Sequence, residues 1–137
     1  MAFNQDANEF HWLMDMLESV EVGLVVLDLD FHVQAWNGFM EHHSGITASQ
    51  IRDKVLFEAF PDIPEAWLTR KVDAVAMLNT RAFTSWEQRP YLFKFRNTRP
   101  ITGTEAYMFQ NLTISPITAP NGEVEKVCLL VYDVTEF

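Results

Sequence analysis

Near the N-terminus, hydrophobic residues recur at the spacing of a helix. They follow one another at alternating steps of four and three residues, and the stripe consists of Phe3, Ala7, Phe10, Met14 and Leu17. This is the spacing of a coiled-coil seam, in which an apolar stripe packs against a second helix. The pattern predicts an amphipathic helix within residues 1–19. We expect this helix to join two copies of the chain in a homodimer.

Two short apolar segments then predict a β-hairpin. Residues 22–28 (VGLVVLD) are almost continuously apolar, as in a strand that is covered on both faces. Residues 31–36 (FHVQAW) predict the partner strand, and Leu29 and Asp30 supply a tight turn between the two.

Capping residues predict short helices after the hairpin. Asn37 is a favourable N-cap for a helix over residues 38–43, and Gly45 is suited to end it. Residues 49–54 and 56–60 predict two further helical turns.

A longer helix is predicted over residues 64–79. Pro64 fits the first turn of a helix, where its missing N–H is not needed. Leu68, Val72 and Val75 fall on one face at helical spacing. We expect this face to pack against the rest of the domain.

Three strands are predicted in the last part of the chain. They cover the aromatic-rich residues 84–96, then residues 105–117, then residues 123–134 with the apolar centre VCLLVY. Asn121 and Gly122 form a hairpin signal between the last two. A hairpin, several helices and a three-stranded meander make a five-stranded antiparallel sheet with short helices on one face, an α+β architecture.

Composition and charge limit the classes of function. The chain has 137 residues, 48% of them hydrophobic and 13% aromatic, which suits one packed domain. Its formal net charge of −9 argues against binding to nucleic acid or to an anionic membrane. Cys128 is the single cysteine, so no intramolecular disulfide can form. Without a membrane-spanning apolar run or a secretion signal, we expect a cytoplasmic protein.

Taken in order, the segments resemble the PAS family. VGLVVLDLDFHVQAWN is similar to its opening hairpin, with Asp28 ending the first strand and Asn37 opening the helix. LTISPI resembles the penultimate strand, and NGEVEKVCLLVYDVTE resembles the last strand with its closing Asp-Val-Thr, residues 133–135. Asp53 departs from the pattern, since the family often has glycine there. The resemblance implies a PAS domain over residues 20–137.

The resemblance also implies a missing partner. In PAS proteins, the segment after the closing Asp-Val-Thr usually leads into an output module. The chain stops two residues after Thr135, so we expect a regulatory domain of a larger protein rather than an enzyme. The helical region is most similar to bacterial proteins with a GGDEF diguanylate cyclase, and a histidine kinase is the other output implied.

Metal and cofactor signals are weak. His42 and His43 are adjacent, so on a regular helix they point about 100° apart and cannot chelate one ion. In related sensors a haem-binding histidine or a flavin-reactive cysteine lies on or near the long helix, but residues 64–79 contain no histidine and Cys128 lies in a predicted strand. We expect no metal site and no catalytic residues. Haem and flavin stay open without being indicated.

A ligand site is implied at the centre of the fold. Trp36 and Met40 occupy positions that commonly face the PAS cavity, where the apolar face of the long helix could complete a pocket; that face consists of Leu68, Val72 and Val75. The same side chains could instead simply fill the core. Asn111 would offer a hydrogen bond to a ligand if it faces inward, and would lie on a solvated strand face if it faces outward.

Two functions follow from these alternatives. The first is a sensory or regulatory module that binds a small ligand or cofactor and shifts between two packings. The alternative is a ligand-free dimerisation module that sets the geometry of the output domain.

Overall fold

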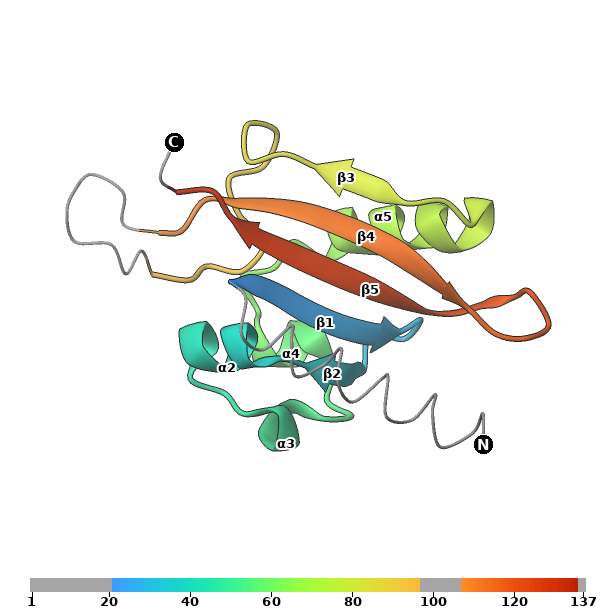
Figure 1. Ribbon diagram of the computed structural model, residues 1–137, viewed down its shortest axis with the longest axis horizontal. Coiled ribbons are helices and arrows are strands. Elements are labelled where there is room, and N and C mark those ends of the chain that lie inside the picture. Colours follow the sequence, from blue (N-terminus) through green and yellow to red (C-terminus); the bar gives the residue numbers. More distant parts are fainter. Residues whose placement is uncertain (1–20, 97–106, 136–137) are drawn as a thin grey trace, which may run out of the picture.

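The described part of the protein is built on one antiparallel sheet. The computed structural model describes residues 21–96 and 107–135. Five strands form the sheet in the order β2-β1-β5-β4-β3 (Figure 1). They are β1 Val22–Asp28, β2 Val33–Trp36, β3 Ala82–Thr84, β4 Gln110–Thr118 and β5 Val124–Asp133. The predicted five-stranded α+β architecture is therefore confirmed, while the predicted helix within residues 1–19 lies outside the described residues.

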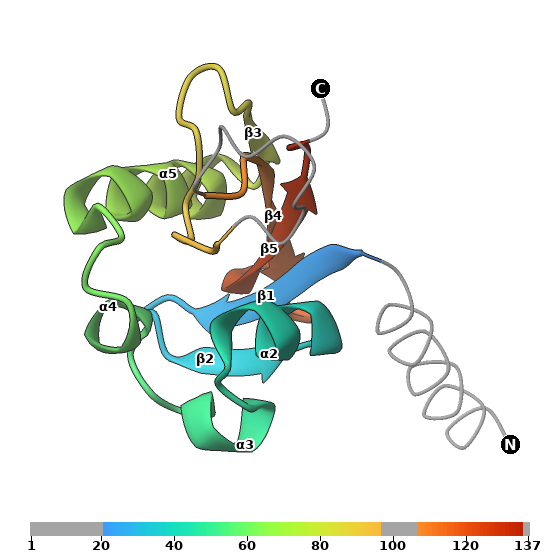
Figure 2. The same ribbon diagram turned by 90° about the vertical axis from the view of Figure 1, so that its left-hand side faces the viewer.

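Four helices of the described ranges share a core with one face of the sheet (Figure 2). They are α2 Gly38–Ser44, α3 Ala48–Ile51, α4 Leu56–Ala59 and α5 Glu65–Leu78. The Asn37 side chain caps α2 by accepting a hydrogen bond from the Met40 N–H, and Gly45 ends it at φ 74°, where glycine is favoured. Both predicted caps are confirmed. None of the helices in this part of the chain is long and apolar enough to cross a lipid bilayer.

The core lies between the helices and the inner face of the sheet. Alternate strand residues point inward, and the buried ones are Val25, Leu27, Leu112, Ile114, Val127, Leu129 and Val131. Gly23 on the same face lets α2 approach, since a Cβ at this position would lie 2.5 Å from Met40 Sδ. The first and last strands are neighbours, and Val22 pairs with Tyr132. The two ends of the domain therefore meet in the middle of the sheet.

The strand predicted over residues 84–96 is wrong for most of its length. The strand beside β4 is the three-residue β3, Ala82–Thr84. The chain then turns, with the Gln88 and Arg89 N–H groups donating to the Ser85 carbonyl, and leaves the sheet. Phe93 and Phe95 of this segment enter the core instead of lying on a strand, and the Gln110 side chain bonds the backbone of residues 92 and 93.

Candidate functional site

Five of the six predicted ligand residues lie together in the core. Trp36 is 4% exposed, and the other four are at most 2% exposed, namely Met40, Leu68, Val72 and Val75. All five belong to one continuous cluster of buried side chains. Their contact with a ligand stays a prediction.

Phe93 occupies the middle of this cluster and was not identified from the sequence as a site residue. Its ring is fully buried, 5.9 Å from Trp36 and 5.3 Å from Phe60, both edge-to-face, and stacked 5.4 Å from Phe95. Such aromatic pairs stabilise beyond their buried area. The segment between β3 and β4 therefore supplies an aromatic side chain that packs on Trp36, one of the predicted ligand residues.

Gln110, at the start of β4, holds this segment in place. Its side-chain oxygen accepts hydrogen bonds from the Leu92 and Phe93 N–H groups at 3.0 and 3.1 Å, and its amide nitrogen donates to the Phe93 carbonyl at 2.8 Å. Gln110 is only 2% exposed. A buried amide with these partners substitutes for the strand ladder that residues 92 and 93 lack.

Asn111, the sixth predicted residue, lies apart from the other five. It alternates with the buried Gln110 and Leu112, so its side chain lies on the sheet face turned away from the helices. There its Oδ1 accepts a hydrogen bond from the Trp86 N–H at 2.9 Å. The outward orientation is thus the one observed.

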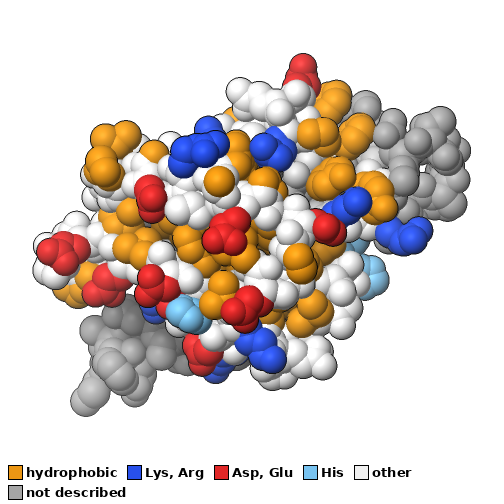
Figure 3. Space-filling model, turned by 180° about the vertical axis from the view of Figure 1, so that it is seen from behind, with side chains coloured by type: hydrophobic (Ala, Val, Ile, Leu, Met, Phe, Trp, Pro, Cys, Tyr) orange, Lys and Arg blue, Asp and Glu red, His pale blue; other side chains and the backbone are white. Residues whose placement is uncertain are grey.

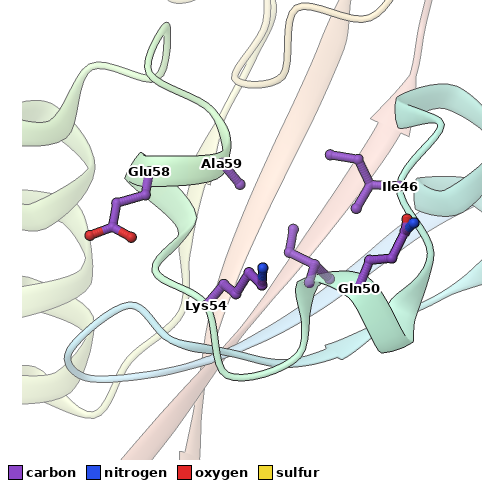
Figure 4. Close-up of a pocket in the computed structure, with 6 residues that line it drawn as sticks. Ile46, Gln50, Lys54, Glu58 and Ala59 are labelled. Carbon is purple, nitrogen blue, oxygen red and sulfur yellow. The ribbon is translucent and has the colours of Figure 1, made fainter.

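An open pocket of about 530 Å³ lies between α3 and α4 (Figure 4). It is lined by Ile46, Gln50, Ile51, Lys54, Glu58 and Ala59. This size falls in the range of small-molecule sites. These residues were not predicted, because they come from three short segments whose convergence depends on the tertiary fold.

Hydrogen bonds to neighbouring elements fix the walls of this pocket. The Trp36 indole N–H donates to the Ile46 carbonyl at 3.0 Å, which ties one wall to the core. The Lys54 carbonyl accepts from the Val33 N–H at 2.9 Å, which ties the other side to β2. The backbone of the pocket is therefore held by the sheet in the absence of any ligand.

Among the described residues, His43 and Cys128 have shifted pKa values. Burial lowers the pKa of His43, with a further contribution from neighbouring His42, while Asp133 and Glu21 partly oppose the shift. Burial raises the pKa of the Cys128 thiol to about 11, so this cysteine is protonated at neutral pH. Within the described ranges, no three His, Cys, Asp or Glu side chains gather as metal ligands.

Charged and apolar side chains are interspersed on the helical side of the molecule (Figure 3).

The closing Asp-Val-Thr, residues 133–135, is hydrogen-bonded into the fold at the C-terminal end of β5. Thr135 Oγ1 donates to Asp133 Oδ1 at 2.6 Å and accepts from the Phe109 N–H at 3.0 Å. The exit from β5 is thereby anchored to the segment that precedes β4.

Comparisons with known proteins agree with this geometry. The family described as the PAS fold matches residues 17–137. A sensory box sensor histidine kinase from Vibrio cholerae is similar at 30% identity and a TM-score of 0.67, over 98% of this chain and 99% of that one. The PAS domain of a Colwellia psychrerythraea protein is similar at 16% identity and a TM-score of 0.64, over 100% of both chains. Curated proteins give no match.

A third similar structure is the PAS domain of nitrogen regulation protein NR(II) from Vibrio parahaemolyticus. It shares 15% identity at a TM-score of 0.59, over 88% of this chain and 96% of that one. At this identity the likeness concerns the fold alone. The family match covers most of the chain and agrees with the sheet order, the Asn37 cap and the closing Asp-Val-Thr. The chain therefore belongs to the PAS fold family.

Proposed function

We propose that this domain is the cytoplasmic sensory or regulatory part of a larger bacterial signalling protein. It binds a small ligand or cofactor and passes a conformational change to an output domain beyond residue 135. The observation that carries the proposal is the pocket between α3 and α4, whose wall at Ile46 is hydrogen-bonded to Trp36 in the core. A ligand that displaces this wall acts directly on the aromatic cluster.

A short series of bonded groups leads from Trp36 to the middle of the sheet. Asn37, the next residue, donates to the Val22 carbonyl at 2.8 Å and accepts from the Leu24 N–H at 3.0 Å. Val22 in turn pairs with Tyr132, next to the closing Asp-Val-Thr. Ligand binding would shift the population between two packings of these contacts, by no more than its difference in affinity for the two.

The output domain in this proposal is a histidine kinase or a diguanylate cyclase. The similar protein from Vibrio cholerae, at 30% identity, is a sensory box sensor histidine kinase, which supports the kinase. The choice of a diguanylate cyclase as output domain is supported by the resemblance of the helical region to GGDEF proteins.

Melting temperatures with a panel of small metabolites and cofactors test the proposal. A ligand at about a hundred times its Kd should raise the melting temperature by roughly 5–10 °C. Trp36→Phe removes the hydrogen bond to Ile46 and should reduce this rise, whereas Trp86→Phe, stacked on Phe109 elsewhere, should keep it. A rise that is equal in both variants would contradict a role for Trp36.

A ligand-free dimerisation module is the second candidate function. Two observations favour it. Phe93 already fills the centre of the core, and the sheet face turned away from the helices carries apolar side chains. On that face Leu130 and Tyr132 are partly exposed, and Phe83 is 59% exposed. An apolar face of this kind suits a symmetric contact between two copies.

Deleting residues 1–18 tests the predicted homodimer through the N-terminal helix. If that helix is the interface, the shortened protein should have the mass of a monomer in light scattering. A shortened protein that keeps the dimer mass would exclude the helix as the interface and leave the sheet face as the candidate.

A further inference from the structure

The pocket between α3 and α4 presents two hydrogen-bond donors. Within the described ranges, no side chain or backbone group accepts from the Lys54 ammonium or from the Gln50 amide nitrogen. The Gln50 oxygen is already engaged, because it accepts from the Thr47 N–H at 2.9 Å in a capping box. One acceptor site of the Gln50 oxygen is thus used, whereas both N–H groups of its amide nitrogen stay available to a ligand, as the Lys54 ammonium does.

Among the described residues, no acidic side chain forms an ion pair with the Lys54 ammonium. Glu58 also lines the pocket, but its side chain points away from the other labelled residues (Figure 4). No ion pair joins Glu58 to Lys54 in the described part of the chain. A cationic ligand would be repelled by the Lys54 ammonium, and an uncharged apolar ligand would give that ammonium no hydrogen-bond partner.

The rest of the lining is apolar and its backbone is held in place. Ile46 and Ala59 provide hydrocarbon surface beside the two donors (Figure 4), and the buried Ile51 also borders the pocket. The Lys54 N–H donates to the Ile51 carbonyl at 3.0 Å, and its carbonyl accepts from Val33. The Lys54 side chain therefore extends from a backbone that is fixed at the edge of an apolar surface.

We propose that this pocket binds an aliphatic carboxylate, whose head group accepts from Lys54 and Gln50 and whose hydrocarbon tail covers Ile46 and Ala59. The assignment rests on the proposed sensory function and specifies its ligand class. A charge-assisted hydrogen bond to the carboxylate supplies orientation, and burial of the tail supplies most of the affinity.

The test is a titration of isotope-labelled protein with octanoate, octanol and octylamine, followed by NMR. Octanoate should shift the backbone amides of Ile46 and Ala59 and should bind more tightly than either analogue. Lys54→Met keeps the hydrocarbon stem and removes the charge, so it should weaken octanoate by roughly tenfold and leave octanol unchanged. Lys126→Met on β5 is the matched control and should bind octanoate as the wild type does.

Equal affinity of octanoate and octanol, tighter binding of octylamine, or an unchanged octanoate affinity in Lys54→Met would each overturn the assignment. So would shifts that occur only at residues outside the pocket. If none of the three probes binds but another compound raises the melting temperature, the ligand class is wrong while the proposed sensory function stands.

Discussion

Asn37 shows how much of the fold depends on one side chain. It is 1% exposed and hydrogen-bonded to the Val22 carbonyl and to the Leu24 and Met40 N–H groups. The side-chain amide of Asn37 therefore caps α2 and also hydrogen-bonds the backbone of β1 at the point where β2 ends. No apolar residue of similar size can make these bonds.

Replacing Asn37 with Ala should lower the free energy of unfolding by about 2–4 kcal/mol, because a helix cap is lost and a buried N–H is left unpaired. Urea unfolding at equilibrium measures this. Asn121→Ala in the exposed turn between β4 and β5 is the matched control and should change stability by about 0.5 kcal/mol or less. Equal losses in the two variants would contradict the role assigned to Asn37.

His43 should make stability fall on acidification. Because burial depresses its pKa below 6.5, the unfolded chain binds the proton more strongly, and the stabilisation present above pH 6.5 is lost as the pH falls through the folded pKa. An NMR titration should give an imidazole pKa below 6.5. His43→Phe, which can still pack on Phe39 and Phe95, should show a smaller fall in melting temperature between about pH 7 and pH 5. A fall as large as that of the wild type would contradict the assignment.

For single residues, features that depend on neighbours in the sequence could be predicted. Features that depend on separate segments meeting in the tertiary structure could not. Asn37 and Gly45 were identified because a cap depends on neighbours within one helical turn. Lys54 and Gln50 look like ordinary surface residues in the sequence. Their pocket exists only because β2 and Trp36 hold the segments that carry them.

Among the elements, the segment between β3 and β4 departs most from the sequence prediction. The segment is rich in aromatic residues, as strands often are, and Phe93 and Phe95 stand two residues apart, like neighbours on one face of a strand. A side chain from another part of the chain, Gln110, supplies the hydrogen bonds that a neighbouring strand would have made. Composition alone could not reveal this, since the Gln110 side chain reaches the segment only in the tertiary structure.

Gln110→Met should release this segment. The variant keeps the size of the side chain but leaves the Leu92 and Phe93 N–H groups unpaired, at a cost of about 2–4 kcal/mol. The Phe93 carbonyl keeps its hydrogen bond from the Phe95 N–H. Hydrogen exchange of the Leu92 and Phe93 amides should accelerate. Gln88→Met, exposed in the same segment, is the matched control and should leave their exchange unchanged. Unchanged exchange in Gln110→Met would contradict this role of the Gln110 side chain, and would leave backbone hydrogen bonds and the packing of Phe93 to hold the segment.

For the whole molecule, the sequence predicted the architecture better than the site. The order of strands and helices follows from hydrophobic periodicity and turn residues, which are largely local. The predicted wall of Trp36, Met40 and the long helix lies in the buried core, where Phe93 packs edge-to-face on Trp36, and its contact with a ligand stays a prediction. An apolar pocket wall and an apolar core have the same pattern in a sequence, so only the tertiary structure distinguishes them.

The central claim is that the domain holds a small ligand. Mass spectrometry of the purified folded protein, under conditions that preserve weak complexes, tests it most directly. If the domain holds a ligand, the spectrum should show a mass above that of the polypeptide, which disappears on denaturation as one small compound is released. A folded protein whose mass equals that of one or two bare chains would contradict the claim and favour the ligand-free dimerisation module.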